Sequence, residues 1–185
     1  MSEPDSRAPG RPRSEASRAA LIDAAYWRTV ELGYEQATAE AIAKAAGAGK
    51  QTLYRWWPSK GALVLEAMLT KLKERIDRPR EAAMRAGDLE RFLIADLAQL
   101  KTYADALAGL VVEARSDPDL RGRLLEQWLS RRAADLYVAL SLAVPDTGRR
   151  EVAAEAIEGA ILARTLHGRP LDDAFARSLA ALVRT

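Results

Sequence analysis

Apolar and polar positions along this chain repeat with the period of an α-helix, and glycine and proline separate the repeating segments. An apolar stripe between Leu21 and Leu32 predicts a first helix. Ser14 or Ser17 is expected to cap its start, and Gly33 to end it in a left-handed conformation. β-Branched and polar residues do not alternate over the length of a strand anywhere in the chain. The pattern therefore predicts an all-α fold.

Two short helices are predicted next, separated by a tight turn. Thr38 is a natural N-cap for a helix through Ala46, and Gly47 is expected to end it. The following helix is predicted from Lys50 to Trp56 or Trp57. Because the connecting turn is short and contains glycine, the spacing is typical of a helix-turn-helix motif, whose second helix enters the major groove of DNA.

The rest of the chain is predicted to form further helices. Pro58 ends the third helix, and Ser59 caps a fourth. This fourth helix is expected to run to about Arg78 and to be closed by Pro79. Further helices are expected at about residues 88–106, 107–115, 118–142, 149–166 and 172–184, of which those beginning near 88, 118 and 172 have an aspartate as cap.

Composition narrows the range of functions. The chain has 185 residues, of which 49% are hydrophobic and 29% charged, so it can bury a core as one domain or two small ones. The absence of cysteine excludes disulfides, thiolate metal sites and cysteine nucleophiles. With His167 as the single histidine, we expect no metal site and no cofactor.

Charges interrupt every apolar stretch, and residues 1–18 contain no apolar core of a signal peptide. We therefore expect no contact with a membrane and a cytoplasmic location.

Basic residues gather at the start of the chain. The net charge is only +2, and residues 61–185 carry as many acidic as basic side chains. Residues 1–13 are expected to form a flexible basic arm, in which Arg11 and Arg13 reach DNA. Residues 10–12, Gly-Arg-Pro, resemble the core of an AT-hook, which lies in the minor groove. The alternative is a solvated tail.

Residues 33–68 resemble the N-terminal domain of TetR-family transcriptional regulators. The matching features are Thr38, the run Ile42–Gly47, Lys50, the stretch Thr52–Tyr54, and the sequence Pro58–Lys60. The resemblance is strong over residues 14–68, and beyond them it extends only to the all-helical character and the length. It implies a helix-turn-helix DNA-binding domain at residues 14–60 and an effector-binding and dimerisation domain at residues 61–185.

The start of the third helix carries hydrogen-bonding side chains that suit a DNA groove. Lys50, Gln51 and Thr52 are aimed at the groove if the motif docks in the usual way. Gln51 can read an adenine edge with two hydrogen bonds.

The resemblance adds further DNA contacts. It implies that Lys50 and Thr52 contact bases or backbone, and that Thr38, Tyr54 and Lys60 contact phosphates. Thr38 can instead serve only as a cap, and Tyr54 only as a half-buried aromatic residue.

The motif departs from the family pattern at three positions. Gly49 stands where serine or threonine is common, Gln51 where a small residue is common, and Trp56 where a phosphate-contacting residue is often found. The role of Trp56 stays open between an indole N–H contact and packing, whereas Trp57 is expected to pack.

The second half of the chain carries candidate ligand and dimer surfaces. Large side chains on the middle helices are candidates to line an effector pocket: Phe92, Gln99, Tyr103, Trp128 and Tyr137. Ordinary core or surface placement is the alternative for each. Small and apolar residues on the last two helices suit a two-fold bundle, so we expect a homodimer that forms through them.

The sequence thus predicts a TetR-like regulator that a small-molecule effector releases from a palindromic operator, most simply a repressor. The first alternative is a helical protein–protein adaptor that has kept the fold without binding DNA. An enzyme is not expected, because His167 has no recognisable serine partner and Lys44 stands where a P-loop requires glycine.

Overall fold

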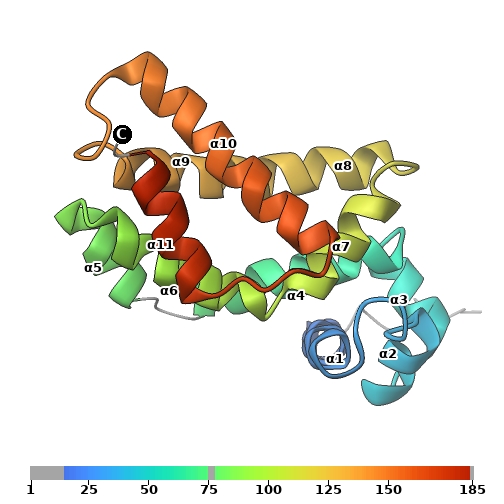
Figure 1. The fold of residues 1–185 in the computed structure, drawn as a ribbon. Helices are drawn as coiled ribbons and strands as arrows, with labels where there is room; N and C mark the ends of the chain where they lie inside the picture. The colour runs from blue at the N-terminus through green and yellow to red at the C-terminus, as the bar shows by residue number, and fades with distance from the viewer. Residues whose placement is uncertain (1–14, 75–77, 184–185) are drawn as a thin grey trace, which may run out of the picture.

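The computed structural model describes residues 15–74 and 78–183, and within these residues the ordered elements are helices without strands (Figure 1). This confirms the predicted all-α fold. The elements are α1 Glu15–Leu32, α2 Ala39–Ala45, α3 Lys50–Trp56, α4 Lys60–Glu74, α5 Arg78–Ala86, α6 Leu89–Lys101, α7 Ala104–Glu113, α8 Pro118–Leu124, the π-helix η1 Leu125–Leu129, α9 Ser130–Ala139, α10 Thr147–Leu166 and α11 Asp173–Leu182.

The helices form a head and a body. The head consists of α1, α2 and α3, which pack on one another at one end of the molecule (Figure 1). α4 packs along α1 and also contacts α7 and α8, so it ties the head to the body. α5 and the C-terminal end of α11 lie at the far end from α2 and α3.

Local signals set most of the helix ends. Several helices begin at a side chain that accepts a hydrogen bond from the backbone N–H three residues later: Thr38, Asp88, Asp117, Asp146 and Asp172. Gly33 and Gly47 adopt φ values of 82° and 63°, which only glycine adopts readily. The predicted bounds of the three head helices are therefore confirmed to within one or two residues.

The prediction that Pro79 closes a helix is wrong. α4 ends at Glu74, and Pro79 is the second residue of α5, a helix that the sequence did not predict. Proline is tolerated in the first turn of a helix, because the N–H groups there have no intrahelical acceptor. Pro79 therefore marks the start of α5 and not the end of α4.

The predicted break between residues 106 and 107 lies at Thr102 and Tyr103 instead. Tyr103 is 1% exposed, and its ring centroid lies 5.8 Å from that of Trp128 and 6.1 Å from that of Tyr26. Neither glycine nor proline marks this break. Packing of the tyrosine between distant elements sets it instead.

The predicted helix 118–142 contains a π-turn and ends at Ala139. Leu124, Trp128 and Leu136 are buried on its inner side. In an α-helix, side chains four residues apart drift round the axis by about 40°. The looser π-turn offsets this drift. Trp128 therefore stays on the inner side of the helix.

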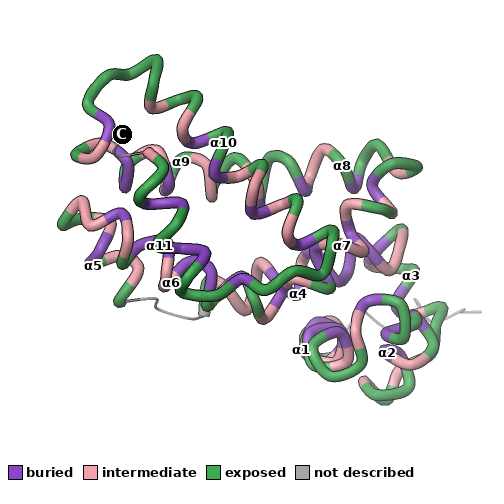
Figure 2. The backbone as a smooth tube through the Cα atoms, in the orientation of Figure 1, coloured by how far each residue is buried: buried purple, intermediate pink, exposed green. Residues whose placement is uncertain are grey.

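The buried residues form one continuous core that joins the head to the body (Figure 2). Leu21, Ile42 and Leu53 are fully buried in the head. The tyrosine pair Tyr26 and Tyr103 carries the core from α1 to the start of α7. Head and body thus share packing and are not separated by a linker.

Candidate functional site

The outward face of α3 is polar, and its inward face anchors the head. Leu53 is fully buried, whereas Tyr54 is 45% exposed. Lys50, Gln51 and Arg55 are exposed, and Thr52 is half-buried. The residues predicted to contact DNA on this helix thus lie on an accessible surface.

Lys50 is held by a neighbouring carboxylate. Its ammonium group donates to Glu40 on α2 and lies 5.8 Å from the centre of the Tyr54 ring. The hydrogen bond to Lys50 lowers the pKa of Glu40, and both side chains are exposed. Exposed ion pairs contribute little to stability. Lys50 can therefore leave Glu40 and bind a phosphate oxygen at little cost in free energy.

Thr38 caps α2 and stays accessible. Its Oγ1 accepts a hydrogen bond of 3.1 Å from the N–H of Ala41, and the residue is exposed. A hydroxyl group that accepts through oxygen still carries a proton to donate. The cap and a phosphate contact are therefore compatible.

The two tryptophans at the end of α3, Trp56 and Trp57, face the core of the head. Trp57 is 2% exposed, and its indole N–H donates to Glu66 at 2.7 Å. The Arg18 guanidinium lies 5.6 Å from the Trp56 ring and 5.5 Å from the Trp57 ring, and it pairs with Glu66. Packing of Trp57 is confirmed. The buried Trp57 side chain is therefore not accessible to a protein partner.

Lys60 points toward the turn between α1 and α2. Its ammonium group donates to the Tyr34 carbonyl at 2.7 Å and lies 3.6 Å from the centre of the Tyr34 ring. Burial lowers the pKa of Lys60. The structure therefore places Lys60 in an intramolecular contact, and its phosphate contact stays a prediction.

Tyr34 fastens the head to α7 of the body. Its N–H donates to Asp105, and its hydroxyl donates to Glu113. Glu113 also accepts from the backbone N–H of Gly61 at 3.1 Å. Burial and the hydrogen bond to Glu113 raise the pKa of Tyr34, so its phenol keeps the proton that it donates. We call Tyr34, Lys60, Asp105, Gly109 and Glu113 the joint.

Gly109 allows the joint to close. A Cβ atom added at Gly109 would lie 2.2 Å from Cδ1 of Tyr34 and 2.8 Å from its Cβ. Real Cβ atoms essentially never approach so closely. The tyrosine ring therefore rests directly on the backbone of α7.

A cavity of about 140 Å³ lies in the body between α4, α5, α6 and the stretch from η1 to α9. Its apolar wall includes Leu69, Leu72 and Leu100. Of the predicted ligand-binding residues, Gln99, Tyr103 and Trp128 line it. Phe92 and Tyr137 do not: Phe92 is 1% exposed beside the Arg80 guanidinium, and the Tyr137 ring contacts Arg150.

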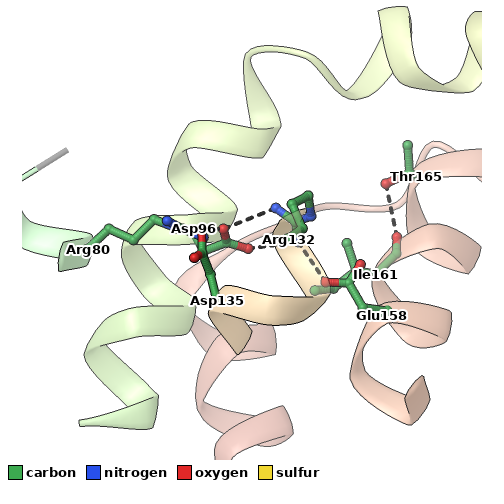
Figure 3. A network of polar contacts seen from close by, with 7 residues as sticks. All are labelled: Arg80, Asp96, Arg132, Asp135, Glu158, Ile161 and Thr165. Carbon is green, nitrogen blue, oxygen red and sulfur yellow. Dashed lines mark hydrogen bonds and ion pairs between the residues drawn. The ribbon is translucent and has the colours of Figure 1, made fainter. Parts of the chain in front are cut away.

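A buried ionic network forms the polar wall of the cavity (Figure 3). Asp96, which is 2% exposed, accepts from Arg80 at 2.9 Å and from Arg132 at 2.8 Å. Arg80 also donates to Asp135 at 2.9 Å, and Arg132 lies 3.4 Å from Glu158 on α10. Burial raises the pKa of Glu158. The network thus links four helices at one side of the cavity.

Arg11 and Arg13 lie outside the described residues, so their DNA contacts stay predictions. Within residues 15–74 and 78–183, no helix is long and apolar enough to cross a membrane, and no cluster of side chains has the makeup of a metal site.

Comparisons with known proteins agree with the motif. The family described as bacterial regulatory proteins, tetR family, matches residues 21–67. An uncharacterized HTH-type transcriptional regulator of Bacillus subtilis, YdeS, is 33% identical over 90 residues, 45% of this chain and 46% of that protein. The chain thus spans about half the length of this relative.

Two further proteins match over most of the chain. The DNA-binding transcriptional repressor TetR of Mycobacteroides abscessus is 28% identical over 174 residues, 88% of this chain and 89% of that protein. The crystal structure of the TetR family transcription regulator SCO0332 has a TM-score of 0.64 and 28% identity, and covers 90% of this chain and 96% of its own. The chain belongs to the TetR family.

In this TetR-family chain, neither the joint nor the ionic network was predicted from the sequence. Asp96 gave a signal, because it lies four residues after Phe92 and four before Leu100, within an apolar stripe. The joint gave none, since Tyr34 and Glu113 are 79 residues apart. The named relatives are transcriptional regulators, not enzymes.

Proposed function

We propose that this chain is a cytoplasmic transcriptional repressor that binds a palindromic DNA operator as a homodimer and leaves it when a small molecule fills the cavity. The observation that carries the proposal is the accessible polar face of α3, with Lys50, Gln51 and Tyr54 exposed above the buried Leu53. A helix of this kind docks in the major groove with its side chains on base edges and phosphates. The similarity to the DNA-binding transcriptional repressor of Mycobacteroides abscessus supports repression.

The dimer forms through α10 and α11 in this proposal. Large apolar side chains are exposed on these helices: Val152 is 66% exposed, Leu166 47% and Leu182 67%. On α10, Gly159 lies seven residues after Val152 and seven before Leu166, and no atom lies within 4 Å of a Cβ added there, so it leaves room for a close second helix. Two heads related by a two-fold axis then read half-sites about 34 Å apart.

The cavity communicates with the head through Tyr103. This residue lines the cavity, precedes α7, and contacts Tyr26 of α1. α4 offers a second route, because it contributes Leu69 and Leu72 to the cavity and begins at Lys60 in the joint. A ligand that favours a different arrangement of α4 and α7 therefore changes the position of the head, and DNA weakens that ligand's binding in return.

A charged variant in the dimer surface tests the proposal. Val152→Asp places a carboxylate in an interface that should exclude water, whereas Val138→Asp changes a 51% exposed valine on α9. Sedimentation should show a monomer for Val152→Asp alone, with affinity for a palindrome reduced to that for one half-site. A dimeric Val152→Asp that binds the palindrome like the wild type would contradict the proposed interface.

A further inference from the structure

The cavity in the body has a chemistry of its own, which narrows the class of molecule that fits it. A cavity near 150 Å³ in another protein holds one benzene ring. The cavity here has a volume of about 140 Å³. It therefore suits a single ring or a short branched chain.

The acidic side chains in the wall already have cationic partners. Asp96 is bound by Arg80 and Arg132, and Asp135 by Arg80. Glu81 lies 3.8 Å from Arg85, one helical turn away. A cationic ligand would have to compete with these arginines for every carboxylate in the wall.

Apart from the amides of Gln99 and Gln127, which can both donate and accept, the side chains that remain available in the wall are donors. Trp128 is 4% exposed, and its indole N–H has no hydrogen-bond partner among the described residues. Lys73 and Arg131 also line the cavity, and neither forms an ion pair with a described carboxylate. An indole, an ammonium and a guanidinium can only donate. A ligand with acceptor oxygens and negative charge therefore matches the two cations without an ion pair and the buried indole donor of this wall.

The backbone at Trp128 supports a ligand site at this wall. Trp128 belongs to η1, in which the N–H of Ser130 donates to the carbonyl of Leu125. Single π-turns inside helices occur frequently at functional sites. Arg131 follows Trp128 by three residues, a spacing that brings two side chains to the same side of a helix.

We propose that the cavity binds a small organic carboxylate with a single-ring or similarly compact apolar body, whose carboxylate accepts from Trp128 and pairs with Lys73 and Arg131. The apolar body lies against Leu69, Leu100 and Tyr103. This inference rests on the proposed function, because it names the class of effector that would occupy the regulatory site. It excludes organic cations and long-chain ligands.

Three probes of similar size test the charge preference on the full chain by titration calorimetry. Benzoate, benzamide and benzylamine share one ring and differ in charge. Benzoate should bind at least about tenfold more tightly than either of the others, since charged acceptors form the stronger hydrogen bonds. Preference for benzylamine, or no binding of any probe, would overturn the inference.

Conservative variants locate the contact. Trp128→Phe keeps an aromatic ring but removes the pyrrole part of the indole with its N–H, and it should weaken benzoate binding about tenfold while leaving benzamide less affected. Trp27→Phe, at a 55% exposed residue of α1, is the matched control. Unchanged benzoate affinity in a folded Trp128→Phe protein would contradict the assignment.

The two cations in the cavity wall have their own matched control. Lys73→Gln with Arg131→Gln should weaken benzoate binding about tenfold and leave benzamide binding unchanged. Lys101→Gln with Arg115→Gln, at two exposed positions outside the cavity wall, should change neither. Equal losses in both double variants would indicate long-range attraction only and would overturn the proposed site.

DNA binding measured in the same preparations separates this inference from the proposed function. Operator binding without any benzoate binding overturns the ligand class alone. Benzoate binding that leaves the operator complex intact supports the cavity chemistry and contradicts release by the effector.

Discussion

Replacement of Gly109 by alanine tests the joint between head and body. Alanine is favoured over glycine inside a helix by about 0.5–1 kcal/mol. At Gly109, however, the new Cβ would lie 2.2 Å and 2.3 Å from Cδ1 and Cγ of Tyr34. The ring cannot move freely, because the N–H, hydroxyl and carbonyl groups of Tyr34 all have partners. Overpacking of this kind costs about 1–3 kcal/mol.

The matched control is Gly122→Ala in α8, where an added Cβ meets no atom within 4 Å. Gly122→Ala should raise the free energy of unfolding by about 0.5–1 kcal/mol. Gly109→Ala should lower it by about 1–3 kcal/mol. Urea unfolding followed by circular dichroism measures both, at one fixed protein concentration because the proposed dimer would add to stability. Gly109→Ala should also weaken operator binding, since the head moves with Tyr34.

A second substitution shows whether Tyr34 is the cause. In a Tyr34→Ala background the ring is gone, so Gly109→Ala should become stabilising by about 0.5–1 kcal/mol. A Gly109→Ala protein as stable as the wild type, or a loss that persists without the ring, would refute the reasoning about the joint.

Three further predictions concern the head and the ionic network. Lys50→Ala should weaken operator binding and reduce the slope of log affinity against log salt by about 1, whereas Lys101→Ala should change neither in fluorescence anisotropy. Thr38→Ala should lower the free energy of unfolding by about 1 kcal/mol in urea, because α2 loses its cap, and Thr38→Ser should restore it. Because burial raises the pKa of Glu158, the native state binds this proton more tightly than the unfolded chain does. The stability that it contributes is present below the ordinary glutamate pKa and is lost as the pH rises through the native pKa. The free energy of unfolding of Glu158→Gln, measured in urea, should therefore rise relative to that of the wild type as the pH rises from the ordinary glutamate pKa through the native pKa.

Each of these three predictions would be contradicted by one particular result. A Lys50→Ala slope equal to that of the wild type would remove Lys50 from the phosphate contacts. Equal stability of the alanine and serine variants of Thr38 would show that the cap does not matter. A Glu158→Gln difference that is constant with pH would show that Glu158 titrates alike in both states.

The head could be predicted from the sequence because its signals are local. Thr38 as cap and Gly33 and Gly47 in left-handed conformations are read within a few residues, and they fix α2 and its turns. The body could be predicted less well. Its break at Tyr103 depends on packing against Tyr26 and Trp128, which no local signal encodes.

The lining of the candidate cavity could likewise be predicted only in part. Gln99, Tyr103 and Trp128 were predicted to line it and do so, whereas Phe92 and Tyr137 lie outside it. A helical stripe tells which side of a helix faces inward, but not whether the space opposite is filled or empty. For the same reason the pairing of Arg80 and Arg132 with Asp96 could not be predicted, although Asp96 within an apolar stripe indicated that a partner was needed.

The central claim is that this protein reads a palindromic operator as a dimer. The most direct test is to incubate the purified full chain with a library of genomic DNA fragments at two salt concentrations and to sequence the fragments that it retains. The account predicts enrichment of one palindrome, with retention that falls steeply at the higher salt concentration. Retention of no common sequence by an intact, ligand-free dimer would contradict it.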